Sequence, residues 1–203
     1  MIKVLIVGSG ASIFDYEYLN KYKNIKLTTL SSSSSSSDIK INWSNINNIL
    51  KVKENYQFDL VVFFLGRWSS GRIKNINVEL LYKMISNNVL LPLDIFKIFK
   101  KKLWVNKNTK IILISSESTI NTDFTAPEYS YSKLLYEKVF IDYCSVNRIE
   151  KPYILRSPFI LESKIEEESG KIYGDLLERK VISKSEFMMS LKNKINEIFE
   201  TDL

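Results

Sequence analysis

Short apolar runs alternate with longer segments of helical periodicity along this chain. Six of the apolar runs are rich in Val, Ile, Leu and Phe and have the length of strands. The expected strands are 3–7, 25–30, 38–42, 59–65, 110–115 and 153–156, of which 38–42 is the weakest. Strands that are apolar along their whole length are buried on both faces, so the pattern predicts a parallel sheet covered on each side.

Helical patterns fill most of the intervals between these strands. The expected helices are one that ends at about Lys23, then 45–53, 79–100 with a kink at Pro92, 128–147, and a last one that opens with Ser183 and Glu186 at capping-box spacing and carries Phe187, Leu191, Ile195 and Ile198 on one face. The alternation predicts an α/β fold. We expect a three-layer, doubly wound, Rossmann-like domain that binds ligands at the carboxyl ends of about six parallel strands.

The composition fits one soluble domain that spans residues 1–203. The chain is 45% hydrophobic and 26% charged, and no apolar run approaches the roughly eighteen residues of a membrane span. No signal-peptide pattern is present, so we expect a cytoplasmic protein with no membrane partner. The net charge is +6, but the Lys and Arg residues are dispersed among 23 acidic ones, and we expect no nucleic-acid partner.

The absence of histidine narrows the chemistry further. Catalysis by a Ser-His or Cys-His pair and metal sites with His ligands are excluded, and the single cysteine, Cys144, cannot form an internal disulfide. We therefore expect no metal site. Acid/base chemistry is left to Tyr, Lys, Asp, Glu or Cys144.

The turn after the first strand is made of small residues. Gly8, Ser9 and Gly10 follow the strand, and Ser12 and Ile13 lead toward the next helix. Small residues in this place let a pyrophosphate approach backbone N–H groups and the positive end of a helix. The turn has two glycines of a G-x-G-x-x-G motif, with Ile13 in the third place. The pattern favours nucleotide binding, although a plain strand-to-helix turn would have the same residues.

Tyr129 and Lys133 are four residues apart and share one face of the expected helix 128–147. An ammonium beside a phenol favours the phenolate and lowers a tyrosine pKa that is ordinarily about 10. Such a pair is a general acid/base that needs no histidine. Tyr22 and Lys26 have the same spacing without further signs of a site, so the spacing alone does not identify one.

Two further residues give this pair a recognisable context. Ser116 follows the fifth strand, and Asn88 lies in the long helix before that strand. Asn88, Ser116, Tyr129 and Lys133 resemble the catalytic tetrad of the short-chain dehydrogenase/reductase family in order, approximate spacing and element. The resemblance covers roughly residues 1–160.

The resemblance implies an NAD(P)H-dependent enzyme that reduces a small-molecule carbonyl or oxidises the alcohol by hydride transfer. Tyr129 would protonate the carbonyl oxygen, and Lys133 would hold the nicotinamide ribose and lower the tyrosine pKa. Ser116 would donate a hydrogen bond to the reacting oxygen, and Asn88 would help to hold a water for proton relay. The cofactor supplies the hydride, and the protein supplies orientation and electrostatics.

The resemblance also assigns a cofactor site. Its expected members are Gly8, Ser9, Gly10, Ser12, Ile13, Ser31, Gly66, Tyr129, Lys133 and Pro158. Serines fill positions 31–37 after the second strand, where an NAD-binding enzyme carries a carboxylate for the ribose hydroxyls. Hydroxyls without a carboxylate favour NADP over NAD, and a functionally silent serine loop is the alternative interpretation.

Several positions depart from the family pattern. Phe14 stands where a glycine is usual, and we expect it to crowd the helix against a dinucleotide. The other departures are Phe63-Phe64-Leu65 before Gly66, Asn42 or Trp43 where an acidic residue is usual, and Phe159 after Pro158. No seventh strand is evident. These departures affect the expected affinity for the cofactor more than the tetrad chemistry.

Two other functions compete with a carbonyl reductase. Glu137, four residues after Lys133, and the sequence Leu155-Arg156-Ser157-Pro158 resemble the branch of the family that epimerises or dehydrates nucleotide-sugars. A non-catalytic dinucleotide-binding sensor or scaffold is the other alternative, because the glycines of the turn are incomplete.

The resemblance implies two further features. Helices equivalent to 79–100 and 128–147 pair across a dimer axis in the family, so we expect a homodimer through these helices. The apolar residues expected on their exposed faces are Leu90, Phe96, Leu135 and Phe140. The segment 159–184 is expected to face the substrate, whose identity the sequence leaves open.

Overall fold

The computed structural model describes residues 1–33, 36–67, 77–120, 126–160 and 181–200. A six-stranded sheet runs through the molecule in the order β3-β2-β1-β4-β5-β6, and every pairing in it is parallel. The strands are β1 (Ile2–Val7), β2 (Ile25–Ser31), β3 (Ile39–Lys40), β4 (Leu60–Phe63), β5 (Lys110–Ser116) and β6 (Tyr153–Ser157). The predicted doubly wound parallel sheet is confirmed, and all six expected strands are present.

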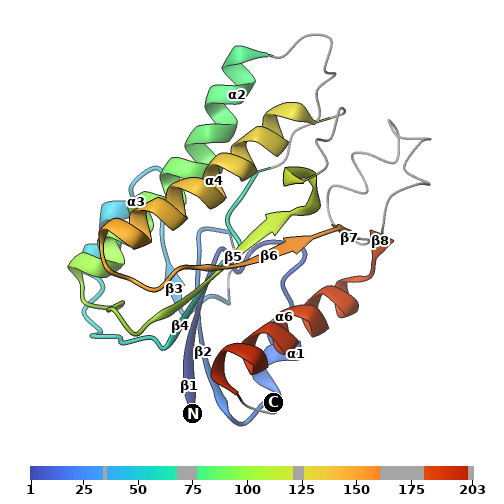
Figure 1. Ribbon diagram of the computed structural model, residues 1–203. Coiled ribbons are helices and arrows are strands. Elements are labelled where there is room, and N and C mark those ends of the chain that lie inside the picture. Colours follow the sequence, from blue (N-terminus) through green and yellow to red (C-terminus); the bar gives the residue numbers. More distant parts are fainter. Residues whose placement is uncertain (34–35, 68–76, 121–125, 161–180, 201–203) are drawn as a thin grey trace.

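Helices cover both faces of this sheet (Figure 1). They are α1 (Tyr16–Asn20), α2 (Val78–Ile85), α3 (Leu91–Lys101), α4 (Pro127–Val146) and α6 (Lys184–Phe199), with short 3-10 helices η1 (Ile46–Lys51) and η4 (Glu117–Thr119). α2, α3 and α4 lie on one side, and α1 and α6 lie on the other. Each face therefore has its own hydrophobic core, the larger one being built on aromatic contacts of Phe63 with Phe96 and Phe140.

The burial of Phe96 and Phe140 corrects one expectation. Both rings are fully buried against the sheet, whereas Leu90 and Leu135 are exposed as expected. The sequence alone does not separate the two pairs, because helices on a sheet have a wide apolar face. Among the described residues, no helix is both long and apolar enough to cross a membrane.

The long helix expected at 79–100 is built from three pieces. A π-helical turn, η3 (Ser86–Leu90), joins α2 to α3, and Leu91 N–H donates to the Ser86 carbonyl across five residues. Pro92 lies in the first turn of α3 and has no N–H to donate to the carbonyl of Asn88. The helix is therefore distorted by the π-helical turn around Asn88, one turn before Pro92, where the kink was expected.

Helix α1 is shorter than expected, because it ends at Asn20 instead of about Lys23. It also begins late, with Asp15 as its N-cap: the Asp15 carboxylate accepts a hydrogen bond of 3.0 Å from Tyr18 N–H. The residue before it, Phe14, is buried with its ring edge against Phe64, 5.2 Å between centroids. Burial of this ring keeps 8–14 out of the helix and delays its first turn.

The last helix confirms the predicted capping box. Ser183 Oγ accepts from Glu186 N–H, and the Glu186 carboxylate accepts from Ser183 N–H. Phe187 is buried on the sheet as expected. A separate parallel pair, β7 (Phe159–Ile160) with β8 (Val181–Ile182), precedes the helix. Most of the expected substrate-facing segment 159–184 lies outside the described residues.

Candidate functional site

The carboxyl ends of β1, β4 and β5 meet at one edge of the sheet, next to the N-terminal half of α4. β1 and β4 are neighbours that belong to the two halves of the sheet, so the strand order reverses between them. A ligand crevice forms at such a switch point. Gly8 follows β1, Gly66 follows β4 after Phe64 and Leu65, and Ser116 is the last residue of β5.

Lys133 extends from α4 to this edge and is almost fully buried, with 4% of its surface exposed. Its Nζ donates to the Ile114 carbonyl at 2.8 Å and to the Leu65 carbonyl at 3.5 Å, so it bridges the ends of β5 and β4. Burial lowers the pKa of the ammonium to about 8, while the negative charge of Glu137 acts in the opposite direction. A side chain at Gly66 would start 3.1 Å from Nζ, so glycine leaves this position open.

Asn88 is completely buried, and its amide is committed to local structure. Its Oδ1 accepts from Arg67 N–H at 2.6 Å, and its Nδ2 donates to the Arg67 carbonyl at 3.0 Å and to Ser132 Oγ at 2.9 Å. Ser132 in turn donates to the Tyr129 carbonyl at 2.8 Å. The amide therefore ties the segment after β4 to α4.

Tyr129 lies in the first turn of α4, one turn before Lys133, and is half-buried. Ser116 caps η4, and its hydroxyl accepts from Ser118 N–H at 3.3 Å and from Ser118 Oγ at 3.0 Å. A hydroxyl that accepts two hydrogen bonds still has its own proton to donate. Pro158 follows Ser157, the register partner of Ser116 on β6, so it lies beside the same strand end.

The structure brings the other candidate cofactor residues together around Gly8 and Gly10. Gly8 has φ +90°, and a Cβ there would come within 3.0 Å of Leu65 Cδ2. A Cβ on Gly10 would overlap Ser33 Oγ at 2.1 Å and approach Ser31 Oγ at 2.8 Å. Ser12 and Ile13 continue the chain away from this contact toward Asp15. The serines that follow β2 therefore pack directly on the turn after β1.

The fold of this chain is shared with solved proteins, although its sequence resembles no known family closely. The sequence matches no protein-family model and no curated protein. Solved structures, in contrast, match nearly the whole chain. A short-chain dehydrogenase family protein from Francisella tularensis subsp. tularensis SCHU S4 has a TM-score of 0.72 at 16% identity, with coverage of 94% of this chain and 89% of that chain. This chain has the short-chain dehydrogenase/reductase fold.

Two enzymes with this fold bear on the site. Ligand-free aldohexose dehydrogenase from Thermoplasma acidophilum has a TM-score of 0.69 at 14% identity, covering 94% of this chain and 85% of that chain. The angucycline C-6 ketoreductase LanV, solved with bound NADP, has a TM-score of 0.67 at 13% identity, covering 94% and 86%. Likenesses at these identities establish the fold, and function has to be argued from the site.

The residues present fit a nicotinamide dinucleotide at one end better than at the other. At the nicotinamide end, the lack of a side chain at Gly66 lets the Lys133 ammonium pack beside the end of β4. At the pyrophosphate end, the Ser9 hydroxyl of the turn is buried without a partner in the described part of the chain, as expected of a group that awaits a ligand. The Asp15 carboxylate, however, takes the helix N-terminus that a pyrophosphate uses in many dinucleotide sites. A pyrophosphate would depend on the turn itself.

Sequence reasoning did not foresee the surroundings of Glu137, which is 3% exposed. Its carboxylate accepts from Ser115 Oγ at 2.6 Å, from Arg156 Nε and a terminal guanidinium nitrogen at 3.0 and 2.6 Å, and from Thr119 Oγ1 at 3.3 Å. The available signal was its position one turn after Lys133. Its partners come from β5, η4 and β6, which the sequence does not place together.

Tyr136, on the same helix, is expected to be a site where a small change stabilises the protein. Its hydroxyl is buried without a hydrogen-bond partner within the described ranges, and its ring lies 4.8 Å from Lys133 Nζ. Because an unpaired buried hydroxyl is costly, Tyr136→Phe is expected to raise the free energy of unfolding by about 1 kcal/mol. Urea unfolding measures the change, and a loss of stability would indicate that the hydroxyl has a partner in solution.

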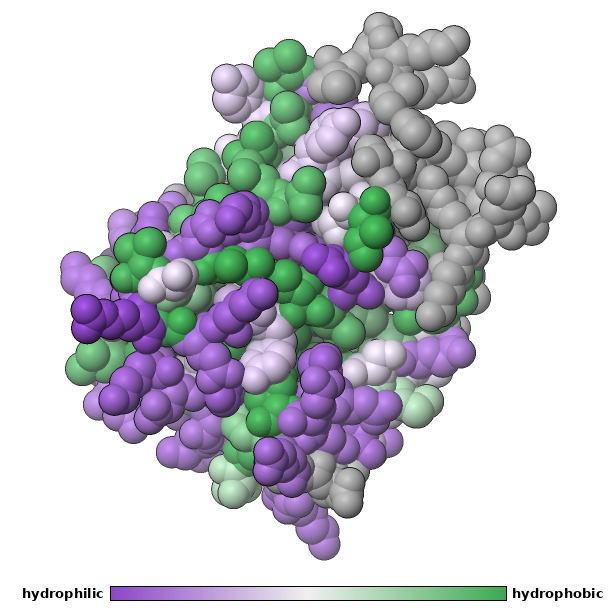
Figure 2. Space-filling view, in the orientation of Figure 1, coloured by the Kyte–Doolittle hydropathy of each residue, from purple (hydrophilic) through white to green (hydrophobic). Residues whose placement is uncertain are grey.

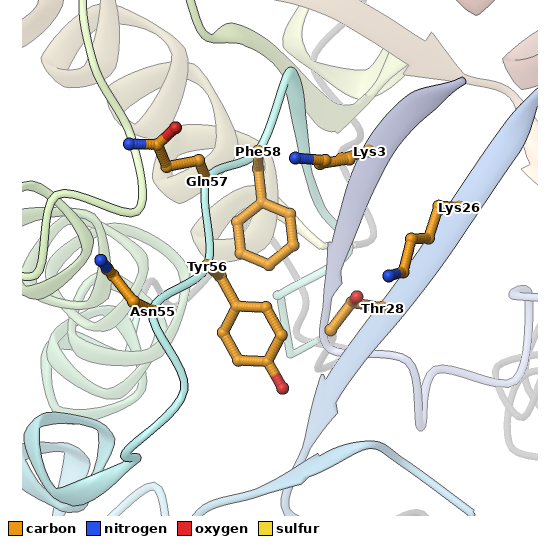
Figure 3. A pocket seen from close by; sticks show the side chains of 7 residues that line it. All are labelled: Lys3, Lys26, Thr28, Asn55, Tyr56, Gln57 and Phe58. Atoms are coloured by element: carbon orange, nitrogen blue, oxygen red, sulfur yellow. The ribbon is translucent and has the colours of Figure 1, made fainter.

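A cavity of about 160 Å³ lies at the opposite, amino-terminal edge of the sheet (Figure 3). Lys3 and Lys26, register partners on β1 and β2, point from the strands toward Tyr56 and Phe58. Thr28, Asn55 and Gln57 complete the lining. None of the candidate site residues belongs to this cavity.

Proposed function

We propose that the protein is an NAD(P)-dependent oxidoreductase that interconverts a small carbonyl compound and its alcohol, with Tyr129 as the acid/base. The observation that carries the proposal is the buried Lys133 ammonium, one helical turn from Tyr129 and packed so close to Gly66 that a Cβ there would lie 3.1 Å from Nζ. The NADP-bound ketoreductase with the same fold supports this assignment.

The chemistry follows from the positions of these groups. A nicotinamide cofactor, when bound, would supply the hydride to the carbonyl carbon. Tyr129 gives its phenolic proton to the carbonyl oxygen as negative charge develops there. Lys133, a cation held beside the ends of β4 and β5, stabilises the phenolate that is left. Ser116 donates its remaining proton to the same oxygen and orients it.

The first experiment separates binding from turnover. Fluorescence titration with NADPH measures binding, and NADPH oxidation is then followed with a panel of aldehydes and ketones. Saturable binding and turnover of at least one carbonyl are expected. Absence of NADPH and NADH binding would overturn the proposal.

Binding without turnover across the panel would favour the second candidate, a dinucleotide-binding sensor or scaffold. The capped end of α1 is the observation that favours it, because Asp15 removes one common source of pyrophosphate affinity. In that case the protein would bind the dinucleotide and would not catalyse hydride transfer.

NADP is the proposed cofactor in preference to NAD. Ser31 and Ser33, which follow β2, place their hydroxyls against Gly10. The carboxylate nearest to β2 along the chain after these serines is Asp38, and it is engaged by Thr29 N–H at 2.7 Å and Thr29 Oγ1 at 2.9 Å. Hydroxyls accommodate a 2′-phosphate that a carboxylate in the same place would repel. Tighter binding of NADH than of NADPH in parallel titrations would reverse this assignment.

Asp15→Asn is expected to tighten NADPH binding by about three- to tenfold. Asparagine caps a helix as well as aspartate does, so α1 is preserved while a negative charge near the pyrophosphate is removed. The gain should shrink at high salt. Isothermal titration measures it, with Asp94→Asn as the control, since Asp94 is an exposed residue paired with Lys97 on α3. Equal affinities for Asp15→Asn and the wild type would mean that the phosphates bind elsewhere.

A homodimer through α2 and α4 is proposed on the basis of exposed apolar side chains. Figure 2 shows hydrophobic residues gathered over these helices. The large hydrophobic side chains that are exposed on α2, η3 and α4 are Val78, Tyr82, Leu90, Tyr131, Leu134 and Leu135. Large exposed apolar surfaces mark interaction sites, and these helices carry several such side chains. Light scattering at micromolar concentration is expected to give twice the chain mass, and Leu134→Glu is expected to give the chain mass. A wild-type monomer would contradict the proposal.

A further inference from the structure

The buried carboxylate of Glu137 joins three elements behind the candidate site. Arg156 on β6 forms a bidentate pair with it, Ser115 on β5 donates from the strand end, and Thr119 donates from η4. Thr119 Oγ1 lies 2.8 Å from the Ser116 carbonyl and 3.3 Å from the Glu137 carboxylate, so its single proton is shared between the two acceptors and lies nearer the carbonyl. Residues before and after Ser116 in the chain, Ser115 and Thr119, therefore both contact Glu137.

Two successive turns of α4 hold two successive residues of β5. Lys133 donates to the Ile114 carbonyl, and Glu137, one turn later, accepts from the Ser115 hydroxyl. Ser116 is the next residue, and η4 begins after it. The hydrogen bonds of Ile114 with Lys133 and of Ser115 with Glu137 therefore fix the strand end that carries Ser116 relative to α4. Helix α4 also carries Tyr129.

We propose that Glu137, held by Arg156, is a positioning residue with two tasks. It fixes the position of Ser116, and its carboxylate compensates the positive charge of the buried Lys133 ammonium. The part concerning Ser116 rests on the proposed function. The part concerning Lys133 is a property of the cofactor-free protein and is tested without turnover.

Stability alone does not account for this pair. A buried ion pair replaced by apolar residues of similar volume is often neutral or stabilising, because removal of both charges from water offsets their attraction. Arg156 is partly exposed, with 38% of its side-chain surface accessible, whereas Glu137 is closed off. The arrangement buries the Glu137 carboxylate one turn of α4 after the buried Lys133 ammonium.

Glu137 is also the charged group that acts on Lys133. Burial lowers the pKa of Lys133, and Glu137 raises it. Tyr129, one turn earlier on α4, is a further titratable group beside Lys133. The remaining described groups that face Lys133 carry no formal charge: the Ile114 and Leu65 carbonyls from β5 and the end of β4, the Tyr136 ring from α4, and Asn88 from η3, whose Oδ1 lies beside Gly66. Arg156 acts through Glu137 by compensating its charge.

Two substitutions should shift the titration of Lys133 in opposite directions. Glu137→Gln keeps the shape and removes the negative charge, so the pKa of Lys133 should fall by about one unit. Arg156→Gln leaves Glu137 its hydrogen bonds from Ser115 and Thr119 without the compensating cation, so the pKa should rise. Asp142→Asn, on the exposed face of α4 where Asp142 pairs with Lys138, is the matched control and should cause no shift.

The measurement is a pH titration of ¹³Cε-labelled lysine by NMR in the cofactor-free protein, with the Lys133 resonance assigned from Lys133→Met. A Lys133 titration that is the same in wild type and both variants would overturn the proposal. If Glu137→Gln fails to fold, Arg156→Gln decides alone, since a partly exposed arginine can be replaced without a cavity in the core.

A kinetic arm tests the effect on Ser116. Glu137→Gln is expected to lower kcat about tenfold at unchanged KM for the carbonyl, and the basic limb of its pH–rate profile should move in the same direction as the Lys133 titration. An unchanged kcat and profile in an active enzyme would overturn the positioning role. The Lys133 titration could shift as expected in a protein that turns over no substrate. That result would refute the proposed function, but it would support the role of Glu137 as the group that compensates the charge of Lys133.

Discussion

Replacing Tyr129 with phenylalanine is expected to lower kcat by about 10²- to 10⁴-fold, the usual contribution of a positioned acid/base. The ring and its place in the first turn of α4 are preserved, so the hydrogen bond from Ser132 to the Tyr129 carbonyl should persist. NADPH affinity and the unfolding transition are measured in parallel, so that a loss of cofactor binding or of folding is distinguished from the loss of the proton donor. Steady-state kinetics with the best substrate of the carbonyl panel measure the loss.

Tyr131→Phe is the matched control for this experiment. Tyr131 lies two residues further along α4 and is exposed, so the same deletion of a hydroxyl should leave kcat unchanged. Full activity in Tyr129→Phe would exclude Tyr129 as the proton donor. Equal losses in both variants would point to a general effect on the helix.

Replacing Lys133 with methionine is expected to abolish activity and at the same time to stabilise the fold. Burial lowers the pKa of Lys133 from 10.5 to about 8, so the folded protein holds this proton less tightly than the unfolded chain does. At pH 7 the charge must be buried on folding, which destabilises the native state. The Ile114 carbonyl loses its hydrogen-bond donor in Lys133→Met, and this loss offsets part of the gain. The variant is therefore expected to have a free energy of unfolding about 2 kcal/mol higher than that of the wild type.

The pH dependence gives this prediction its sign. Between the folded pKa of about 8 and the unfolded value of 10.5, the unfolded chain binds more protons, so wild-type stability should rise with pH across this window. The advantage of Lys133→Met should therefore shrink as the pH approaches 10. Urea unfolding at pH 7 and near pH 10 measures it, with Lys138→Met, an exposed lysine of the same helix, as control. A variant less stable than the wild type at pH 7 would mean that the ammonium is well compensated.

Part of the site could be inferred from the sequence because the relevant distances are local. Tyr129 and Lys133 share a helix, and the four-residue spacing alone sets their geometry. Gly8, Gly66 and Ser116 follow apolar strands, and parallel strands end at a common edge. The strands themselves were predictable because β4 and the stretch of β1 from Val4 to Val7 are buried in the sheet and consist of apolar residues.

Contacts between distant segments were beyond the sequence pattern. The Asn88 amide is satisfied by the Arg67 backbone and Ser132, which assigns it a structural task in addition to any role with water. Phe96 and Phe140 meet Phe63 in the core because α3 and α4 lie on the same face of the sheet. Nothing in the periodicity of either helix indicates which apolar residue will meet which partner.

The sequence by itself determined the alternation of strands and helices, the exclusion of histidine chemistry and the position of the Tyr129–Lys133 pair, because burial, composition and helical spacing are properties of short segments. The tertiary structure alone decided the late start of α1 after Asp15, the packing of Lys133 against Gly66, and the enclosure of Glu137 by Ser115, Thr119 and Arg156. Each of these depends on groups from separate elements whose burial and charge become defined when the chain is packed.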